Sequence, residues 1–221
     1  MAITIFGYGS LLSKASTLRT CPSMKNHRVA AIRGYERIFS LVSISQLRNG
    51  NSNVDLNQIA ALAVRRTSDP TTLCIGTVFE IEEADMVELK KREHRYDITE
   101  MNAFDDGNTD SVVRCLVFTE SNDSTYKAKC DAEGTDVFET IVGQYYSGML
   151  WGRQDIYPVT KYLHYCCNAA SQLVYRGDPD MCQQNFLQSL LADGTTTIGE
   201  YMQNMKNKED EEASKASTYT R

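Results

Sequence analysis

The pattern of apolar and polar positions divides the chain near residue 136. Before this point, runs rich in β-branched and aromatic residues are separated by turn-forming residues, a pattern that predicts strands. We predict strands over residues 3–6, 28–45 with a break at Gly34, 59–64, 74–81, 98–104 and 112–119. After this point, apolar positions recur at helical spacing. We predict helices over residues 137–146, 160–174, 181–191 and 197–202. Strands followed by helices indicate an α+β domain.

One strong helix is predicted inside the β-rich part, over residues 82–92. Acidic residues gather in its first turn, Glu82–Asp85, and basic residues fill its last turn, Lys90–Arg92. That order complements the helix dipole at both ends. Polar stretches rich in Asn, Asp, Gly or Ser predict loops and turns. These stretches are residues 46–58, 105–108 and 120–136.

The length of 221 residues suits a single domain. We predict one domain over residues 1–205, with a β-rich part at 1–136 that carries one main helix and a mostly helical part at 137–205. Residues 206–221 lack apolar anchors, so we expect them to form a disordered tail.

Composition and charge exclude several classes of partner. The net charge is −6 and no basic stripe is visible, which argues against nucleic-acid binding. The first residues hold no basic leader with an apolar run, and no window has the roughly 20 apolar residues of a membrane helix. We therefore expect a cytoplasmic protein without a membrane partner. The seven cysteines form no CxxC pair and the three histidines are scattered, so we predict no metal site. The oligomeric state stays open.

The stretch FGYGSLL, Phe6–Leu12, is a candidate ligand-binding loop because a predicted strand runs directly into two glycines. Glycine permits positive φ and lets a ligand approach backbone N–H groups closely. Such a loop suits a carboxylate, a phosphate or a developing oxyanion. Taken alone, Gly-x-Gly after a strand is more often a plain turn.

Glu93 is the candidate acid–base residue. Met86, Leu89 and Glu93 are spaced three and four apart, which places them on one face of a helix that reaches Glu93. Burying a carboxylate is costly unless it is partnered or protonated. Burial raises the pKa of such a group, as general acid–base work needs. The alternative is that the helix ends before Glu93, which is then a solvated cap or a partner of Arg95.

These segments resemble a known family. FGYGSLL is similar to the glycine loop of the γ-glutamylcyclotransferase superfamily, and FGYGSL is closest to its ChaC-like branch. RGYERIF at Arg33–Phe39 is similar to the strand that follows in ChaC-like proteins. ELKKRE at Glu88–Glu93, followed by Tyr96, resembles the segment with the family's catalytic glutamate. Pro158 with Tyr162 resembles a segment near the family's C-terminus. The resemblance covers roughly residues 3 to 165.

The resemblance implies a γ-glutamylcyclotransferase-like mixed β-barrel or sheet with flanking helices, and an enzyme without a cofactor. Such an enzyme cyclises the γ-glutamyl group of a γ-glutamyl peptide, amino acid or glutathione to 5-oxoproline and releases the amine. Glu93 is its expected general acid/base. The expected substrate-binding residues are Gly7, Tyr8, Gly9, Ser10, Leu11, Tyr96 and Tyr162.

Two questions stay open at this point. The stretch SISQLRNGN, residues 43–51, replaces a Ser-x-x-His-Arg-Gly segment typical of ChaC-like proteins, so the γ-glutamyl substrate is not specified. A non-catalytic module that binds a small acid on the same fold is the alternative to an enzyme.

Overall fold

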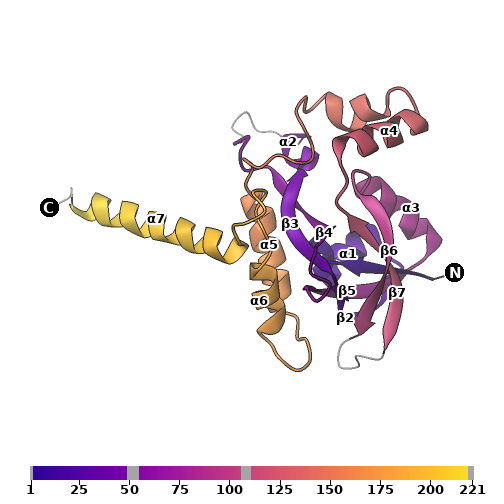
Figure 1. Cartoon of the computed structure of the whole chain (residues 1–221), viewed down its shortest axis with the longest axis horizontal. Coiled ribbons are helices and arrows are strands. Elements are labelled where there is room, and N and C mark those ends of the chain that lie inside the picture. Colours follow the sequence, from indigo (N-terminus) through magenta and orange to yellow (C-terminus); the bar gives the residue numbers. More distant parts are fainter. Residues whose placement is uncertain (1, 49–54, 106–110, 219–221) are drawn as a thin grey trace.

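A closed five-stranded barrel is the centre of the computed structural model, which describes residues 2–48, 55–105 and 111–218. The strand order is β1-β5-β2-β6-β7, and a parallel pairing of β7 with β1 closes the barrel (Figure 1). The barrel strands are β1 (Ile3–Gly7), β2 (Lys25–Arg33), β5 (Leu73–Ile81), β6 (Asp97–Asp105) and β7 (Val112–Thr119). Both faces of β5 are buried, which explains its almost continuous apolar sequence.

A second sheet of two antiparallel strands, β3 (Tyr35–Val42) and β4 (Ala60–Arg66), packs beside the barrel. Gly34 has a φ of +74°, a conformation that side chains disfavour, and it separates β2 from β3. The predicted break at Gly34 is thus confirmed, and it marks the point where the chain leaves one sheet for another.

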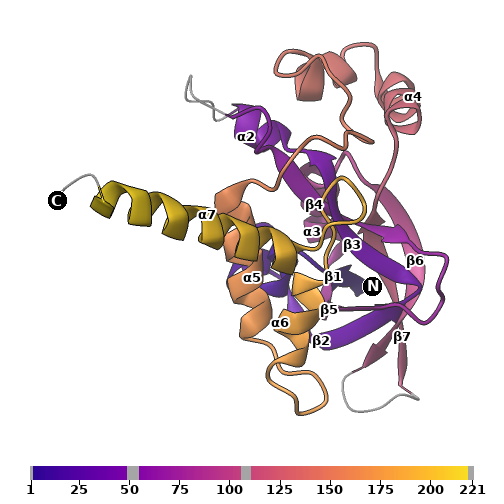
Figure 2. The same ribbon diagram turned by 60° about the vertical axis from the view of Figure 1, so that its left-hand side comes forward.

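Helices surround the two sheets. They are η1 (Ser10–Leu12, a 3-10 turn), α1 (Lys14–Thr20), α2 (Ile44–Arg48), α3 (Glu83–Arg92), α4 (Asp123–Glu133), η2 (Glu139–Gly143, a π-helical turn), α5 (Thr160–Ser171), α6 (Met181–Leu187) and α7 (Ile198–Thr218). The helices α5 and α6 lie between the β-rich body and α7 (Figures 1 and 2). α5 packs on η1 and α6 packs on β5.

The predicted loop over 120–136 is wrong, because α4 occupies most of it. The side chain of Asn122 accepts a hydrogen bond from the Thr125 N–H at 2.9 Å and so caps the helix. Tyr126 and Cys130, four residues apart, form its buried face. The polar composition of the segment hid this short apolar stripe.

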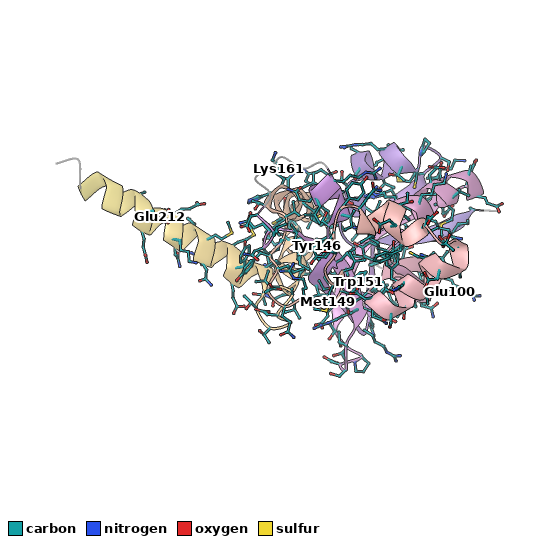
Figure 3. The ribbon with its side chains drawn as sticks, turned by 90° about the horizontal axis from the view of Figure 1, so that it is seen from above. Glu100, Tyr146, Met149, Trp151, Lys161 and Glu212 are labelled. Carbon is teal, nitrogen blue, oxygen red and sulfur yellow. The ribbon has the colours of Figure 1, made fainter. Side chains whose placement is uncertain are left out.

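The C-terminal segment also differs from expectation. The predicted short helix and disordered tail are instead one helix, α7, that continues to Thr218 and projects from the body, with Glu212 on the projecting part (Figure 3). No glycine or proline follows Gly199, and Lys and Glu are good helix formers. Lys208 and Glu212 have the i,i+4 spacing of favourable charge pairs.

Some predicted elements lie partly outside the described residues. The residues that are not described are 49–54 of the predicted loop 46–58, 106–108 of the predicted turn 105–108, and 219–221 of the predicted tail. In the part of the chain that the structure describes, no helix has the length and apolar character to cross a membrane.

Candidate active site at the glycine loop

A small cavity lies where the end of β1, the end of α3 and the first turn of α5 meet. The residues that line it are Phe6, Tyr8, Gly9, Ser10, Leu11, Leu62, Glu93, Tyr96, Phe118 and Tyr162. Every residue predicted for the site is among them except Gly7. The cavity volume is about 30 Å³, enough to hold about one or two water molecules. Residues from distant parts of the sequence therefore converge on this cavity.

The two glycines of the loop are needed for space and not for positive φ, which corrects the expectation from sequence. Neither Gly7 nor Gly9 has a positive φ, and Gly9 has φ −122°. A Cβ atom on Gly9 would lie 2.7 Å from the hydroxyl oxygen of Tyr162. A Cβ atom on Gly7, the last residue of β1, would lie 2.6 Å from the Cβ of Leu11. Gly9 thus keeps the backbone open toward the cavity, and Gly7 lets the loop fold back on its strand.

Glu93 follows α3 directly, and its backbone N–H donates to the Leu89 carbonyl at 2.9 Å. Met86 and Leu89 are buried on the same helix, as the spacing predicted. The helix ends at Arg92, as in the alternative interpretation, but the Glu93 side chain is only 15% exposed and lines the cavity. Burial raises the pKa of the Glu93 carboxyl, while the nearby charges of Arg92 and then Arg95 oppose that rise.

Arg92 is a residue of this site that the sequence interpretation did not select. Its Nε lies 2.9 Å from Oε1 of Glu93. Its Nη2 donates to the Ser10 hydroxyl at 2.6 Å, and its Nη1 donates to the Thr20 hydroxyl at 2.9 Å. The sequence showed Arg92 only as one of three basic residues that close a helix. Its position beside Glu93 in the chain was the one available signal.

Two tyrosines brace the cavity through backbone carbonyls. The Tyr8 hydroxyl donates to the Phe118 carbonyl, and the Tyr96 hydroxyl donates to the Leu62 carbonyl at 2.8 Å. The rings of Tyr96 and Trp151 also pack in a T-shaped arrangement, with 5.6 Å between their centroids. Trp151 is labelled in Figure 3. Burial raises the pKa of both phenols. Both phenols are therefore neutral. Each donates its proton to a backbone carbonyl, so its oxygen can accept a further hydrogen bond.

Tyr162 closes the cavity from the side of α5. Its ring packs edge-on against Phe39, with 6.2 Å between ring centroids, and its hydroxyl lies against Gly9. Burial raises the pKa of this phenol as well. Tyr162 is thus the side chain that stands directly over the glycine loop.

Arg37 places a buried positive charge behind the loop. The residue is 4% exposed. Its Nε donates to the Tyr8 carbonyl at 2.8 Å, its Nη1 donates to Oδ1 of Asn185 at 2.8 Å, and its Nη2 donates to the Ile75 carbonyl. All three acceptors are neutral, and Arg37 has no ion pair within the described residues. An unbalanced buried charge favours an anion nearby.

Across residues 2–48, 55–105 and 111–218, no group of three or more His, Cys, Asp and Glu is arranged to hold an ion. The chemistry of the cavity is that of one carboxyl group, three phenols and the loop backbone.

The fold and the cavity define a class of protein. The chain is an α+β barrel whose first strand ends in a glycine loop facing a buried glutamate. The model of the ChaC-like protein family matches residues 3–146, well over half of the sequence. The chain therefore belongs to the ChaC-like family, and the predicted family is confirmed.

Solved structures share the fold. A γ-glutamyl cyclotransferase is 14% identical, with a TM-score of 0.54 over 94% of this chain and 99% of its own. An uncharacterized protein from Homo sapiens, loc79017, is 15% identical, with a TM-score of 0.50 over 83% of this chain and 85% of its own. A yeast γ-glutamyl cyclotransferase specific to glutathione is 15% identical, with a TM-score of 0.50 over 83% and 95%. The structural likeness to these proteins confirms the predicted α+β fold class. No curated protein sequence matches the chain.

Proposed function

We propose that the protein is a γ-glutamyl cyclotransferase that converts the γ-glutamyl group of its substrate to 5-oxoproline and releases the amine, with Glu93 as general acid/base. Membership of the ChaC-like family and the shared fold support this class of activity. The single observation that carries the mechanism is that Glu93 and the loop Gly9–Leu11 line one cavity. A buried carboxyl group beside the backbone of a glycine loop suits proton transfer at a carbonyl.

The reaction closes a five-membered ring within the substrate. The α-nitrogen forms a bond to the γ-carbonyl carbon, and the bond from that carbon to the leaving amine breaks. Holding the two reacting groups together contributes about 7–11 kcal/mol in well-oriented cases. Two protons leave the α-ammonium, and two reach the released amine once it is protonated in water. The enzyme needs a proton carrier and a folded substrate, and no nucleophile of its own.

Glu93 is suited to carry those protons. An α-ammonium has a pKa of about 8 and an ordinary Glu one of about 4.3, so transfer to an unperturbed Glu is uphill. Burial raises the pKa of Glu93 and so narrows this difference. The oxygens of Tyr8 and Tyr96 accept from the ammonium in this proposal, since both hydroxyl protons already go to carbonyls. The amides of the loop bind the developing oxyanion, and the charge of Arg37 behind the loop favours it.

Substrate entry requires movement at Tyr162. A glutamyl group is several times larger than the cavity of about 30 Å³. The hydroxyl of Tyr162 occupies the space beside Gly9, where the substrate must meet the backbone. We expect the Tyr162 side chain to swing out and then cover the bound glutamyl group.

The test is to incubate the purified protein with glutathione, with γ-glutamyl amino acids and with γ-glutamyl amines, and to measure 5-oxoproline. The same panel identifies the preferred leaving group. Glu93→Gln is expected to lower the rate of release by about 10²- to 10⁴-fold. Glu88→Gln is the matched control, since Glu88 lies on the same helix, is 59% exposed and pairs with Lys91. Turnover near the wild-type rate in a folded Glu93→Gln variant contradicts the mechanism. Binding without turnover in the wild type would instead indicate the non-catalytic module.

A further inference from the structure

The guanidinium of Arg92 joins three separate segments at the cavity. Its three nitrogens each have a different partner, namely the carboxylate of Glu93 after α3, the hydroxyl of Ser10 in η1 and the hydroxyl of Thr20 at the end of α1. The contacts measure 2.9, 2.6 and 2.9 Å. We propose that Arg92 is a positioning residue for Glu93, holding its carboxylate against the glycine loop and favouring return of its proton to the leaving amine. This inference rests on the proposed function.

The positioning follows from the shape of the group. A guanidinium is planar and presents its N–H donors in a fixed fork. Once Nη2 is bound to Ser10 and Nη1 to Thr20, the direction of Nε is set. The Glu93 oxygen that meets Nε is then held at a defined place relative to the loop. A lysine at position 92 has one ammonium centre and cannot reproduce this fork.

The charge of Arg92 acts on the proton cycle. An ion pair stabilises the carboxylate of Glu93, whereas burial favours the neutral acid. When Glu93 takes a proton from the substrate, the pairing with Arg92 loses its electrostatic attraction. Passing the proton on to the leaving amine restores it. Arg92 therefore favours the donating half of the cycle and the ionised form of Glu93 before substrate arrives.

The other groups that face Glu93 do not duplicate this role. Among the described residues, the titratable and charged groups acting on it besides Arg92 are Arg95, Tyr8, Tyr96, Tyr162 and Cys21. Burial raises the pKa of the three phenols and the thiol, so these four groups are neutral. Arg95 directs its Nη1 to the Val42 carbonyl at 3.2 Å. Arg92 is the cation that contacts the carboxylate.

A purely structural role for Arg92 makes a different prediction. The bond to Thr20 ties α3 to α1, and a tie of this kind contributes to stability alone. Its loss would lower the melting temperature without changing the titration of Glu93. The pH dependence of activity and of the Glu93 carboxyl separates the two roles.

The experiment compares Arg92→Gln, Arg92→Lys and Lys91→Gln in the full chain. Lys91 is 68% exposed on the same helix and pairs with Glu88, so Lys91→Gln is the matched control. With the best γ-glutamyl substrate, we expect Arg92→Gln to lower kcat by about 10- to 100-fold through misplacement of Glu93. Removing the positive charge raises the pKa of Glu93, so the acid limb of kcat/KM moves to higher pH by about one unit. Arg92→Lys is expected to keep the limb in place and to recover kcat only in part.

A second measurement does not depend on activity. The carboxyl carbons of ¹³C-labelled glutamate are titrated by NMR, with the Glu93 signal assigned from its loss in Glu93→Gln. We expect its pKa to rise in Arg92→Gln and to stay unchanged in Lys91→Gln. An unchanged Glu93 pKa together with an unmoved acid limb in folded Arg92→Gln overturns the proposal. If Arg92→Gln does not fold, wild-type kcat in Arg92→Lys overturns it instead. Absence of 5-oxoproline release in the wild type would refute the proposed function, while the NMR titration still decides the link between Arg92 and Glu93.

Discussion

The β-rich part and the C-terminal helices contribute unequally to the cavity. The β-rich part supplies the glycine loop, Glu93 and Tyr96, all within the segment 3–146 that matches the family. Among the described residues that line the cavity, Tyr162 is the one that comes from the C-terminal helices. It brings a phenol whose pKa is raised by burial, and it covers the loop. The groups proposed for the chemistry thus lie in one part of the chain, and the cover lies in the other.

Substitutions in the β-rich part and in the C-terminal helices are therefore expected to have different effects. In the proposed mechanism, changes in the β-rich part remove groups that move protons or stabilise charge, and we expect these to lower kcat. Changes in the helices alter how Tyr162 covers the substrate, and we expect these to weaken substrate binding and so raise KM. Arg37 contacts both parts, because it donates to the Tyr8 carbonyl in the β-rich part and to Oδ1 of Asn185 in α6.

The largest effect is expected from Glu93→Gln. General acid–base groups contribute about 10²- to 10⁴-fold to rate, so we expect kcat to fall by that factor with KM changed little. Steady-state kinetics of 5-oxoproline release measure it, beside Glu88→Gln. A variant that lost affinity and kept kcat would place Glu93 in binding and not in proton transfer.

The next effect is expected from Arg37→Met. The substitution removes the hydrogen bonds from Arg37 to the Tyr8 and Ile75 carbonyls and to Oδ1 of Asn185, which keeps only its bond from the Ile75 N–H. We expect a loss of about 3 kcal/mol in the free energy of unfolding. Urea denaturation measures it. Arg33→Met is the control, since Arg33 is exposed on the adjoining strand β2 and stacks over Phe104. Equal free energies of unfolding for the two variants would show that the contacts of Arg37 with Tyr8 and Asn185 do not stabilise the packing of α6 against the β-rich part.

A smaller effect is expected from Tyr162→Phe. The ring that covers the loop is kept and the hydroxyl beside Gly9 is removed. A hydrogen bond from this hydroxyl to a charged group of the bound substrate would contribute about 1.5 kcal/mol or more. We therefore expect kcat/KM to fall by roughly tenfold, mainly through a higher KM. Tyr165→Phe on the same helix, at a 36% exposed position, is the control. If Tyr162→Phe behaves like that control, Tyr162 acts through packing alone.

The smallest effect is expected from deleting residues 206–221. The side chains of residues 206–213 are exposed, and none of them lines the cavity. We expect activity within about twofold of the wild type and a loss of helical signal in circular dichroism, because the deletion removes the projecting part of α7. A large loss of activity would show that α7 acts on the site and that the division between the two parts is incomplete.

Local pattern predicted the strands and the α3 helix well, because periodicity and turn residues report the structure of neighbouring residues. It missed α4, where Asn122 and the pair Tyr126 and Cys130 carry a weak signal inside a polar stretch. It also missed the length of α7, since the absence of apolar anchors argues against packing and does not forbid a helix. The domain boundaries at 136 and 205 stay predictions.

By itself, the sequence determined the α+β class, the glycine loop and the buried helical face, Met86 and Leu89, that leads to Glu93, because each depends on residues close together in the chain. Only the tertiary structure decided why the two glycines are required, since the backbone folds Leu11 back onto Gly7 and packing brings Tyr162, distant in sequence, against Gly9. It likewise decided that Arg92 contacts both Ser10 and Glu93, and that buried Arg37 has no ion-pair partner in the part of the chain that the structure describes. Those contacts join segments up to 148 residues apart, as between Arg37 and Asn185, and no local periodicity records them.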